Sequence, residues 1–331
     1  MKKNILLLAF LLGLIFVCCE PTETFPEKKP INENIVALPN SEHLNNALWI
    51  NDSTLFYSVG YYTITDNFKS IADKILIRKF YDNYIMQDYM DDKILWTRRY
   101  YAPDVGSSVA LNEYSLATGE QTTICEDRLI TGAKYYRDSK YIIYHAYANI
   151  GTSQQRLSAF YLYDRENNTK KVLLSDTTDS YSVAFSNVKG FDIHPEKNIL
   201  LTLGNNYNLI EYNIDSRQVD TLSVSFPPVN NKKFLWLRYD NSGNHVVYSH
   251  YYYIPDSEWG ESEIGILNMQ TNEKQVLDVN TNTRGTSVNI FPSWSPDNKH
   301  IVYGSGSVYI HMKTTPKSLM PELFVLKNVN H

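Results

Sequence analysis

A short turn-and-strand unit recurs six times along the chain, and this recurrence constrains the fold more than any other feature. The best copy spans 291–303, where Phe-Pro-Ser-Trp leads into a Ser-Pro-Asp-Asn turn and an apolar strand. Proline presets φ for a type I turn, and Asp and Asn side chains accept hydrogen bonds from nearby amides. The copies of the apolar strand are Leu55-Phe56-Tyr57, Ile94-Leu95-Trp96, Ile142-Ile143-Tyr144, Ile199-Leu200-Leu201, Val246-Val247-Tyr248 and Ile301-Val302-Tyr303.

The spacing of these copies predicts a β-propeller. Their last residues are 39, 48, 57, 47 and 55 positions apart, and in the middle four units a third strand, a polar turn and a fourth strand follow. Four short strands at a regular period of this length are typical of propeller blades. We therefore expect an all-β fold over residues 36–331, a six-bladed β-propeller with four-stranded blades.

The last unit has no fourth strand of its own after the strand predicted at Glu322–Leu326. An unpaired strand edge at this place would promote aggregation. The segment 31–38 precedes the first unit and can supply the missing strand. We expect this N-terminal strand to complete the last blade and so to close the ring.

The N-terminus has the pattern of a secretory signal. Residues 1–4 are positively charged, and the apolar run at 5–17 is too short to span a bilayer. The run leads directly into Cys18-Cys19 without an Ala-x-Ala site. This resembles a bacterial lipoprotein signal, in which a cysteine is lipidated and becomes the mature N-terminus. We expect lipidation at Cys19, which follows the small residue Cys18; an ordinary cleaved signal or an uncleaved anchor is the alternative.

The chain thus divides into a signal peptide at 1–18, a lipidated flexible tether at 19–35 and the propeller at 36–331. After cleavage Cys125 is the only other cysteine, which excludes an intramolecular disulfide. Loss of Lys2 and Lys3 takes the basic residues from 31 to 29 against 36 acidic residues, a net charge near −7. This charge disfavours nucleic acid or an anionic bilayer as the partner, because phosphate backbones are bound by clustered Lys and Arg, and we expect no nucleic acid partner.

The unit at 291–303 resembles the PD40 repeat of TolB-like propellers. The pattern of that repeat is an aromatic residue, Ser-Pro-Asp-Gly, a basic residue and an apolar strand, and Asn298 stands here in place of the glycine. The other five units are weaker copies within roughly 45–331. The resemblance implies a propeller used for binding. It does not transfer the partner of TolB, since TolB has a separate N-terminal α/β domain for which this chain has no space.

A binding face is expected opposite the uniform Ser-Pro-Asp turns, because successive strands run antiparallel. The loops on that face are predicted at 60–72, 98–107, 145–156, 249–261 and 304–321, and variable loops on a rigid scaffold commonly carry binding residues. Aromatic and Arg side chains there can stack on sugar rings or grip a peptide. Ordinary half-buried strand packing is the alternative for these tyrosines. The predicted ligand-binding face comprises Tyr61, Tyr62, Arg98, Arg99, Tyr100, Tyr101, Tyr147, Tyr251, Tyr252, Tyr253 and Trp259.

The central channel is expected to be lined by the first strands of the blades. Asp88, Lys134, Asp192 and Arg238 occupy corresponding positions in four of these strands. Asp88 and Asp192 can be interpreted as the carboxylate pair of a glycosidase. We favour the other interpretation, in which all four are solvated or salt-bridged channel residues.

Motifs of common enzymes are absent from the sequence. It contains no Gly-x-Ser-x-Gly, no His-Glu-x-x-His, no Cys-x-x-Cys and no P-loop. The acidic residues Asp256, Glu258, Glu261 and Glu263 lack the order of an EF-hand and are interpreted as a solvated loop rather than a Ca²⁺ site. We therefore predict no catalytic residue, no metal and no cofactor.

The sequence favours a lipid-anchored, non-catalytic binding or scaffold module of the bacterial cell envelope. We expect a monomer that binds an envelope protein, a peptide or a glycan, and that contacts the outer membrane, on its periplasmic or outer side, only through the N-terminal lipid. The alternative is an envelope glycan-active enzyme, a hydrolase or lyase, with its site at the channel mouth. Two carboxylates roughly 5–10 Å apart in an open pocket would favour this alternative.

Overall fold

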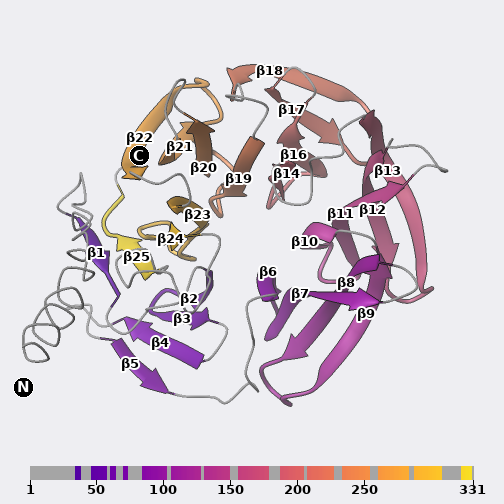
Figure 1. Ribbon diagram of the computed structural model, residues 1–331, viewed down its shortest axis with the longest axis horizontal. Helices are drawn as coiled ribbons and strands as arrows, with labels where there is room; N and C mark the ends of the chain where they lie inside the picture. Colours follow the sequence, from indigo (N-terminus) through magenta and orange to yellow (C-terminus); the bar gives the residue numbers. More distant parts are fainter. Residues whose placement is uncertain are drawn as a thin grey trace, which may run out of the picture.

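Six β-sheets form a ring in the computed structural model (Figure 1), and we call the region around the ring axis, which the first strands line, the central channel. Within the part of the chain that the structure describes there are 25 strands and no helix. No helix in that part is therefore long and apolar enough to cross a membrane. The described residues are 34–38, 46–57, 60–64, 70–73, 84–102, 106–127, 130–149, 156–178, 187–204, 207–226, 233–253, 260–282, 287–307 and 322–329.

The sheets follow one another along the chain, each with its first strand innermost. Sheet 1 has β2 (Ala47–Asn51), β3 (Thr54–Tyr57), β4 (Gly60–Ile64) and β5 (Ser70–Asp73); sheet 2 has β6 (Tyr84–Met90), β7 (Lys93–Ala102), β8 (Gly106–Ser115) and β9 (Gln121–Asp127). Sheet 3 has β10 (Ile130–Tyr136), β11 (Tyr141–Asn149), β12 (Arg156–Asp164) and β13 (Thr169–Thr178); sheet 4 has β15 (Phe191–Ile193), β16 (Ile199–Leu203), β17 (Asn208–Asn213) and β18 (Val219–Ser225). Sheet 5 has β19 (Lys233–Tyr239), β20 (His245–Tyr253), β21 (Gly260–Asn268) and β22 (Lys274–Asn282); sheet 6 has β23 (Ser287–Trp294), β24 (Ile301–Ser307), β25 (Glu322–Leu326) and β1 (Ile35–Ala37).

The predicted all-β propeller with four-stranded blades is confirmed for five of these sheets. Sheet 5 departs from the prediction, because β14 (Asn187–Lys189) pairs with β19 in parallel as a fifth strand. The chain then passes through Gly190 into β15 of sheet 4. A Cβ atom at Gly190 would lie 2.1 Å from the Leu235 carbonyl oxygen, so only glycine permits this close approach of the two inner strands.

The two ends of the described chain meet in sheet 6. Strand β1 pairs antiparallel with β25, with Ile35 opposite Leu326, which confirms the predicted N-terminal strand. This strand begins at Ile35, one residue before the predicted start of the propeller. The Trp49 indole N–H donates a hydrogen bond of 3.1 Å to the Ser293 carbonyl, which joins sheet 1 to sheet 6. The two contacts together close the ring.

The turn at 295–300 explains why asparagine can replace the glycine of the repeat. Asn298 has a φ of +59°, and Gly243, at the equivalent place in sheet 5, has a φ of +71°. Asparagine tolerates this left-handed conformation better than most residues with a side chain. The Ser295 hydroxyl oxygen accepts the His300 N–H at 2.9 Å, which fixes the width of the turn.

Sheet 4 corrects the sequence alignment by one residue. Asp192 pairs with Leu201 in sheet 4 as Arg238 pairs with Val247 in sheet 5. The strand equivalent to the other copies is therefore 200–202 and not 199–201. The error has a physical origin, because Ile199 is an apolar residue at the position where sheets 5 and 6 have His245 and His300.

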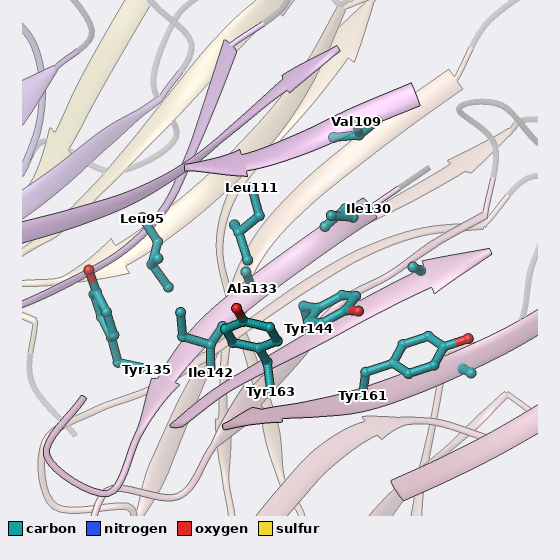
Figure 2. Packing of buried hydrophobic residues seen from close by; sticks show 12 residues of the cluster. Leu95, Val109, Leu111, Ile130, Ala133, Tyr135, Ile142, Tyr144, Tyr161 and Tyr163 are labelled. Atoms are coloured by element: carbon teal, nitrogen blue, oxygen red, sulfur yellow. The ribbon is translucent and has the colours of Figure 1, made fainter. Parts of the chain in front are cut away.

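The hydrophobic core lies between neighbouring sheets rather than at the centre of the ring. Figure 2 shows the cluster between sheets 2 and 3, where Leu95 and Leu111 face Ala133, Ile142 and Tyr144. All five residues are fully buried. Each sheet is thus buried by contact with the sheets on either side, which is the packing expected of a propeller.

Buried tyrosines reinforce these junctions with hydrogen bonds to acids on the preceding sheet. The Tyr144 hydroxyl donates to Asp127 at 3.3 Å, and the Tyr303 hydroxyl donates to Asp278 at 2.7 Å. Both tyrosines hold the third position of the repeated apolar strand. This position therefore combines core packing with a polar link to the preceding sheet, which accounts for part of the high tyrosine content.

These junctions predict a loss of stability at alkaline pH. Burial, together with nearby carboxylates, raises the pKa of Tyr135, Tyr144, Tyr239 and Tyr303 above the usual value near 10. A raised folded-state pKa contributes stability that is complete below the unfolded-state pKa and is lost as pH rises towards the folded-state pKa. We expect the free energy of unfolding, measured with urea from pH 8 to 11, to fall increasingly above about pH 10.

In Tyr144→Phe the free energy of unfolding should fall less steeply with pH, because phenylalanine ionises in neither state. The difference should be up to about 1.4 kcal/mol per pH unit, the contribution of one proton. Leu111→Ala is the matched control: it weakens the same cluster without removing an ionisable group, and should lower the whole curve without changing its slope. An identical slope for Tyr144→Phe and the wild type would contradict the assignment.

Candidate functional site

Four charged side chains lie at one level of the central channel. Their level is fixed by strand pairing, since each stands opposite the equivalent residue of its second strand. We call these four side chains the charged layer, and Leu48 and Ser293 occupy the same level in sheets 1 and 6. The pairs of the charged layer are Asp88–Leu95, Lys134–Ile143, Asp192–Leu201 and Arg238–Val247.

The signs of the charged layer alternate around sheets 2 to 5, and the side chains pair with one another. The Lys134 ammonium lies 2.9 Å from Asp192 Oδ1 and 4.0 Å from Asp88 Oδ1. Arg238 forms an ion pair with Asp88, although their strands β19 and β6 lie on opposite sides of the ring (Figure 1). The layer is therefore electrically balanced and spans the channel. Its side chains are 10–20% exposed.

The second oxygen of each aspartate holds the neighbouring sheet. Asp88 Oδ2 accepts the Tyr135 backbone N–H at 3.0 Å, and Asp192 Oδ2 accepts the Tyr239 backbone N–H at 2.7 Å. Each of these tyrosines donates its hydroxyl back to a glutamate on the third strand of the preceding sheet. The same junction therefore occurs twice, between sheets 2 and 3 and between sheets 4 and 5.

This geometry bears on the glycosidase interpretation of Asp88 and Asp192. Their Oδ1 atoms lie at most 6.9 Å apart, the sum of the 2.9 and 4.0 Å distances to the shared Lys134 ammonium. This upper limit is compatible with the separation of glycosidase carboxylate pairs. A general acid must carry a proton to the substrate, however, and here both oxygens of each carboxylate already face a cation or accept a backbone N–H. The contacts favour a structural role.

A cavity lies beside the charged layer, with about 60 Å³ of space for the centre of a water-sized molecule. Its lining residues come from the first strands of all six sheets, at the charged layer and before it, but not from the turns that follow. The cavity therefore lies on the side opposite the Ser-Pro-Asp turns. Lys134 and Arg238 line it, whereas Asp88 and Asp192 do not. The charged layer thus presents its two cations to the cavity.

A second layer lies two residues earlier in each first strand, since alternate strand residues share a face. Sheets 3 and 4 supply Gly132 and Gly190 to this layer, where a Cβ atom would lie 2.8 Å from the Phe191 ring or 2.1 Å from the Leu235 carbonyl oxygen, so the glycines permit a close approach of neighbouring sheets. Sheets 5 and 6 supply Trp236 and Phe291, whose ring centroids are 5.0 Å apart at an interplanar angle of 64°. One wall of the cavity is therefore backbone and the other is aromatic.

Phe291 is held in this wall by a β-bulge. The pairing of β23 with β24 shifts between Ile290 and Ser293, and Phe291 has a φ of +54°. A bulky residue at positive φ is strained by about 1–3 kcal/mol. Bulges next to binding sites commonly redirect a side chain. The strain at Phe291 is consistent with a ring that is positioned for a ligand.

Two polar contacts complete the wall. The Asn46 amide donates to the Met86 carbonyl at 3.0 Å, and its own Oδ1, in a residue only 7% exposed, has no hydrogen-bond partner among the residues that the structure describes. The Thr131 hydroxyl lies 2.6 Å from Nδ1 of the fully buried His145. Asn46 and Thr131 therefore give the cavity a hydrogen-bonding character as well as an aromatic one.

The predicted ligand-binding residues have a different placement from the one expected. Tyr61 and Tyr62 lie in strand β4, 98–101 lie in β7 and 251–253 lie in β20, so these segments are strands and not loops. Long hairpins continue the strand pairing well past the first strands, which is why the loops are shorter than predicted. Trp259 lies outside the described residues.

Tyr147 corrects the prediction most directly. It is only 3% exposed and packs edge-on against His145, with ring centroids 4.9 Å apart. It belongs to the core of sheet 3 and not to an exposed face. The alternation that places it inside β11 is the half-buried strand packing left open by the sequence.

The sequence reasoning missed Trp236, Phe291 and Asn46. A signal for them exists in the sequence, because each lies two residues before a channel position and must share its face. The bulge at Phe291 has no comparable signal.

The described part of the chain contains no cluster of side chains suited to a metal ion and no reactive thiol. No three His, Cys, Asp or Glu side chains are gathered there as for a metal ion. Of the acidic residues singled out, Glu261 and Glu263 lie in β21, whereas Asp256 and Glu258 lie outside the described residues. Burial raises the pKa of the Cys125 thiol to about 12, so it is protonated at neutral pH.

Comparisons with known proteins support the fold. No protein-family model matches the chain. No curated protein matches it either. Among solved structures, TolB from Acinetobacter baumannii has a TM-score of 0.51 at 13% identity, over 86% of this chain and 64% of that chain. This chain therefore spans about two thirds of the length of that TolB.

Two other solved structures cover nearly the whole of both chains. The β-propeller domain of Cps50 (Swd1) from Myceliophteria thermophila has a TM-score of 0.50 at 11% identity, over 89% of this chain and 100% of that chain. A luciferin-regenerating enzyme has a TM-score of 0.53 at 10% identity, over 91% and 96%. Proteins of such different functions share only the propeller fold with this chain, and a shared fold does not determine function.

The charged layer predicts a measurable coupling across the channel. Asp88→Asn and Arg238→Gln should each destabilise the protein, because each leaves a charged partner poorly compensated. In a double-mutant cycle by urea unfolding, the coupling energy should be about 1–3 kcal/mol. The exposed pair Arg137–Asp215, 2.8 Å apart, is the control and should give less than about 1 kcal/mol. Equal coupling energies in the two cycles would show that the channel pair stabilises the protein no more than an exposed ion pair does.

Proposed function

We propose that the protein is a lipid-anchored, six-bladed propeller of the bacterial cell envelope that binds a protein, peptide or glycan without catalysis. The observation that carries the proposal is the channel cavity, which combines an aromatic wall with hydrogen-bonding side chains and two cations. Concave sites with apolar walls and a few convergent polar groups are the usual form of ligand sites. The proposal moves the expected site from the loops of one face to the channel that opens on the same side.

Catalysis is the second candidate, as a glycan-active hydrolase or lyase at the channel mouth. The separation of Asp88 and Asp192 is the observation that favours it. Their contacts with Lys134, Arg238 and two backbone amides favour binding instead. Product formation from a bound glycan distinguishes the two candidates.

The position of β1 supports an anchored arrangement. This strand is the outermost in sheet 6, at the rim of the ring and away from the channel (Figure 1). A tether that ends at Ile35 leaves from that rim. The 15 residues from 20 to 34 would span on the order of 20 Å as a flexible chain. A lipid at Cys19 would thus hold the ring near a membrane while leaving the cavity accessible.

The binding role is tested with the chain 20–331 on a glycan array and in pull-downs from envelope extract. We expect a specific ligand in one of them, and a loss of affinity of about 10-fold or more for Trp236→Ala, because a buried aromatic contact is removed. Val276→Ala, at an exposed residue of β22 away from the channel, is the matched control and should bind as the wild type does. Empty results in both assays would refute the binding role, and turnover of a bound glycan would establish the enzyme.

The anchor is tested by labelling cells that express the full chain with a palmitate analogue. Wild type and Cys18→Ala should incorporate the label and fractionate with membranes. Cys19→Ala should do neither, because the acylated thiol is missing. Labelling of Cys19→Ala at the wild-type level would contradict the assignment of this residue.

A further inference from the structure

We infer that the channel cavity recognises the carboxylate of an acidic sugar, a uronic acid in a glycan. This inference rests on the proposed binding function and specifies its ligand. It has three parts: the unused hydrogen-bond donors of the charged layer, the balanced charge of that layer, and the aromatic and polar groups beside it.

The cations of the charged layer retain donors that the protein does not use. The Arg238 guanidinium has five N–H groups, and only its bond to Asp88 is made among the residues that the structure describes. The Lys134 ammonium has three N–H groups, and among the described residues it forms ion pairs with Asp192 at 2.9 Å and Asp88 at 4.0 Å, of which only the first is within hydrogen-bond distance. Both side chains line the cavity, while the carboxylates that neutralise them do not. The side of the cavity formed by the charged layer is therefore rich in hydrogen-bond donors, which suit an oxyanion ligand.

The charge of the layer favours a carboxylate over a phosphate monoester. Two cations are already balanced by two carboxylates, and Asp88 Oδ1 lies near both cations. A dianion would therefore be repelled by the buried carboxylates, whereas a monoanion adds one charge only. The planar carboxylate also matches the fork of N–H groups on arginine.

The remaining lining fits a sugar ring. Trp236 and Phe291 line the cavity with aromatic rings, against which the C–H groups of a sugar can pack. The Asn46 Oδ1 is a buried acceptor without a partner among the described residues, and it needs a donor. A uronic acid supplies all three groups: apolar C–H faces, hydroxyl donors and a carboxylate. A fatty acid lacks the hydroxyl donors, and a neutral sugar lacks the carboxylate.

The experiment titrates the chain 20–331 by calorimetry with methyl glucuronide and with methyl glucoside, which has the same ring without the charge. We expect the glucuronide to bind about 10- to 100-fold more tightly, the difference made by charged hydrogen bonds. Its affinity should fall as salt is raised, because salt screens the ion pair, while that of the glucoside should change little.

Variants separate the carboxylate contact from the ring contact. The double variant Asp88→Asn with Arg238→Gln keeps the charged layer balanced, and should reduce the preference for glucuronide to a few-fold. Arg238→Lys keeps the charge and loses the fork, which provides a milder change if the double variant unfolds. Trp236→Ala should weaken both glycosides. Ser293→Ala, at the same level on sheet 6, should preserve the preference.

The outcomes distinguish this inference from the proposed function. Equal binding of glucuronide and glucoside, or a preference that survives in both Arg238 variants, would overturn the acidic sugar while leaving a glycan-binding module. Binding of an acetylated dipeptide with a free carboxylate, but of neither glycoside, would overturn the sugar in favour of a peptide terminus. The absence of any ligand here and in the extract and array assays would refute the proposed function itself.

Discussion

The hydrogen bond from a backbone N–H of one sheet to an aspartate of the preceding sheet is the contact on which the channel depends. Asp88 and Asp192 each commit one oxygen to this bond, so the sheets are held at a fixed distance around the channel. The other oxygen then faces inward and is neutralised by a cation from another sheet. Buried charges are tolerated when they are paired and hydrogen-bonded in this way. The two aspartates are thus held by their bonds to the neighbouring sheets, while their partner cations line the cavity. The side of the cavity formed by the charged layer is positively charged for this reason.

Tyrosine serves the same purpose at the outer levels of the junctions. Its ring contributes core area between sheets, and its hydroxyl reaches an acid on the neighbouring sheet. A protein built from small sheets has no common core, so each junction must supply both apolar burial and directional bonding. The aromatic composition that resembles a binding surface in the sequence is thus, at Tyr144, Tyr147 and Tyr303, a property of the scaffold.

Much of the architecture was predictable from the sequence, because the repeat carries its own turn chemistry and strand period. The N-terminal strand that closes sheet 6 followed from the incomplete last unit. Strand β14 did not, since parallel pairing through Gly190 depends on the distance between two sheets and not on a local pattern. The four members of the charged layer could be placed from alignment alone. Trp236 could have been found by counting back two residues, whereas the bulge that carries Phe291 arises from backbone geometry that residue types do not encode.

The closure of the ring by β1 has a consequence for how the chain acquires its fold. Ile35 and Leu326 are partners in one sheet, although nearly the whole chain separates them in sequence. The first strand to be synthesised therefore has no partner until the last strand exists, and the closing contact carries the largest loop entropy of the molecule. Sheets 2 to 5 can assemble locally in the meantime. The N-terminal strand is therefore the last to pair. A chain shortened by this strand would form an open arc of sheets rather than a ring.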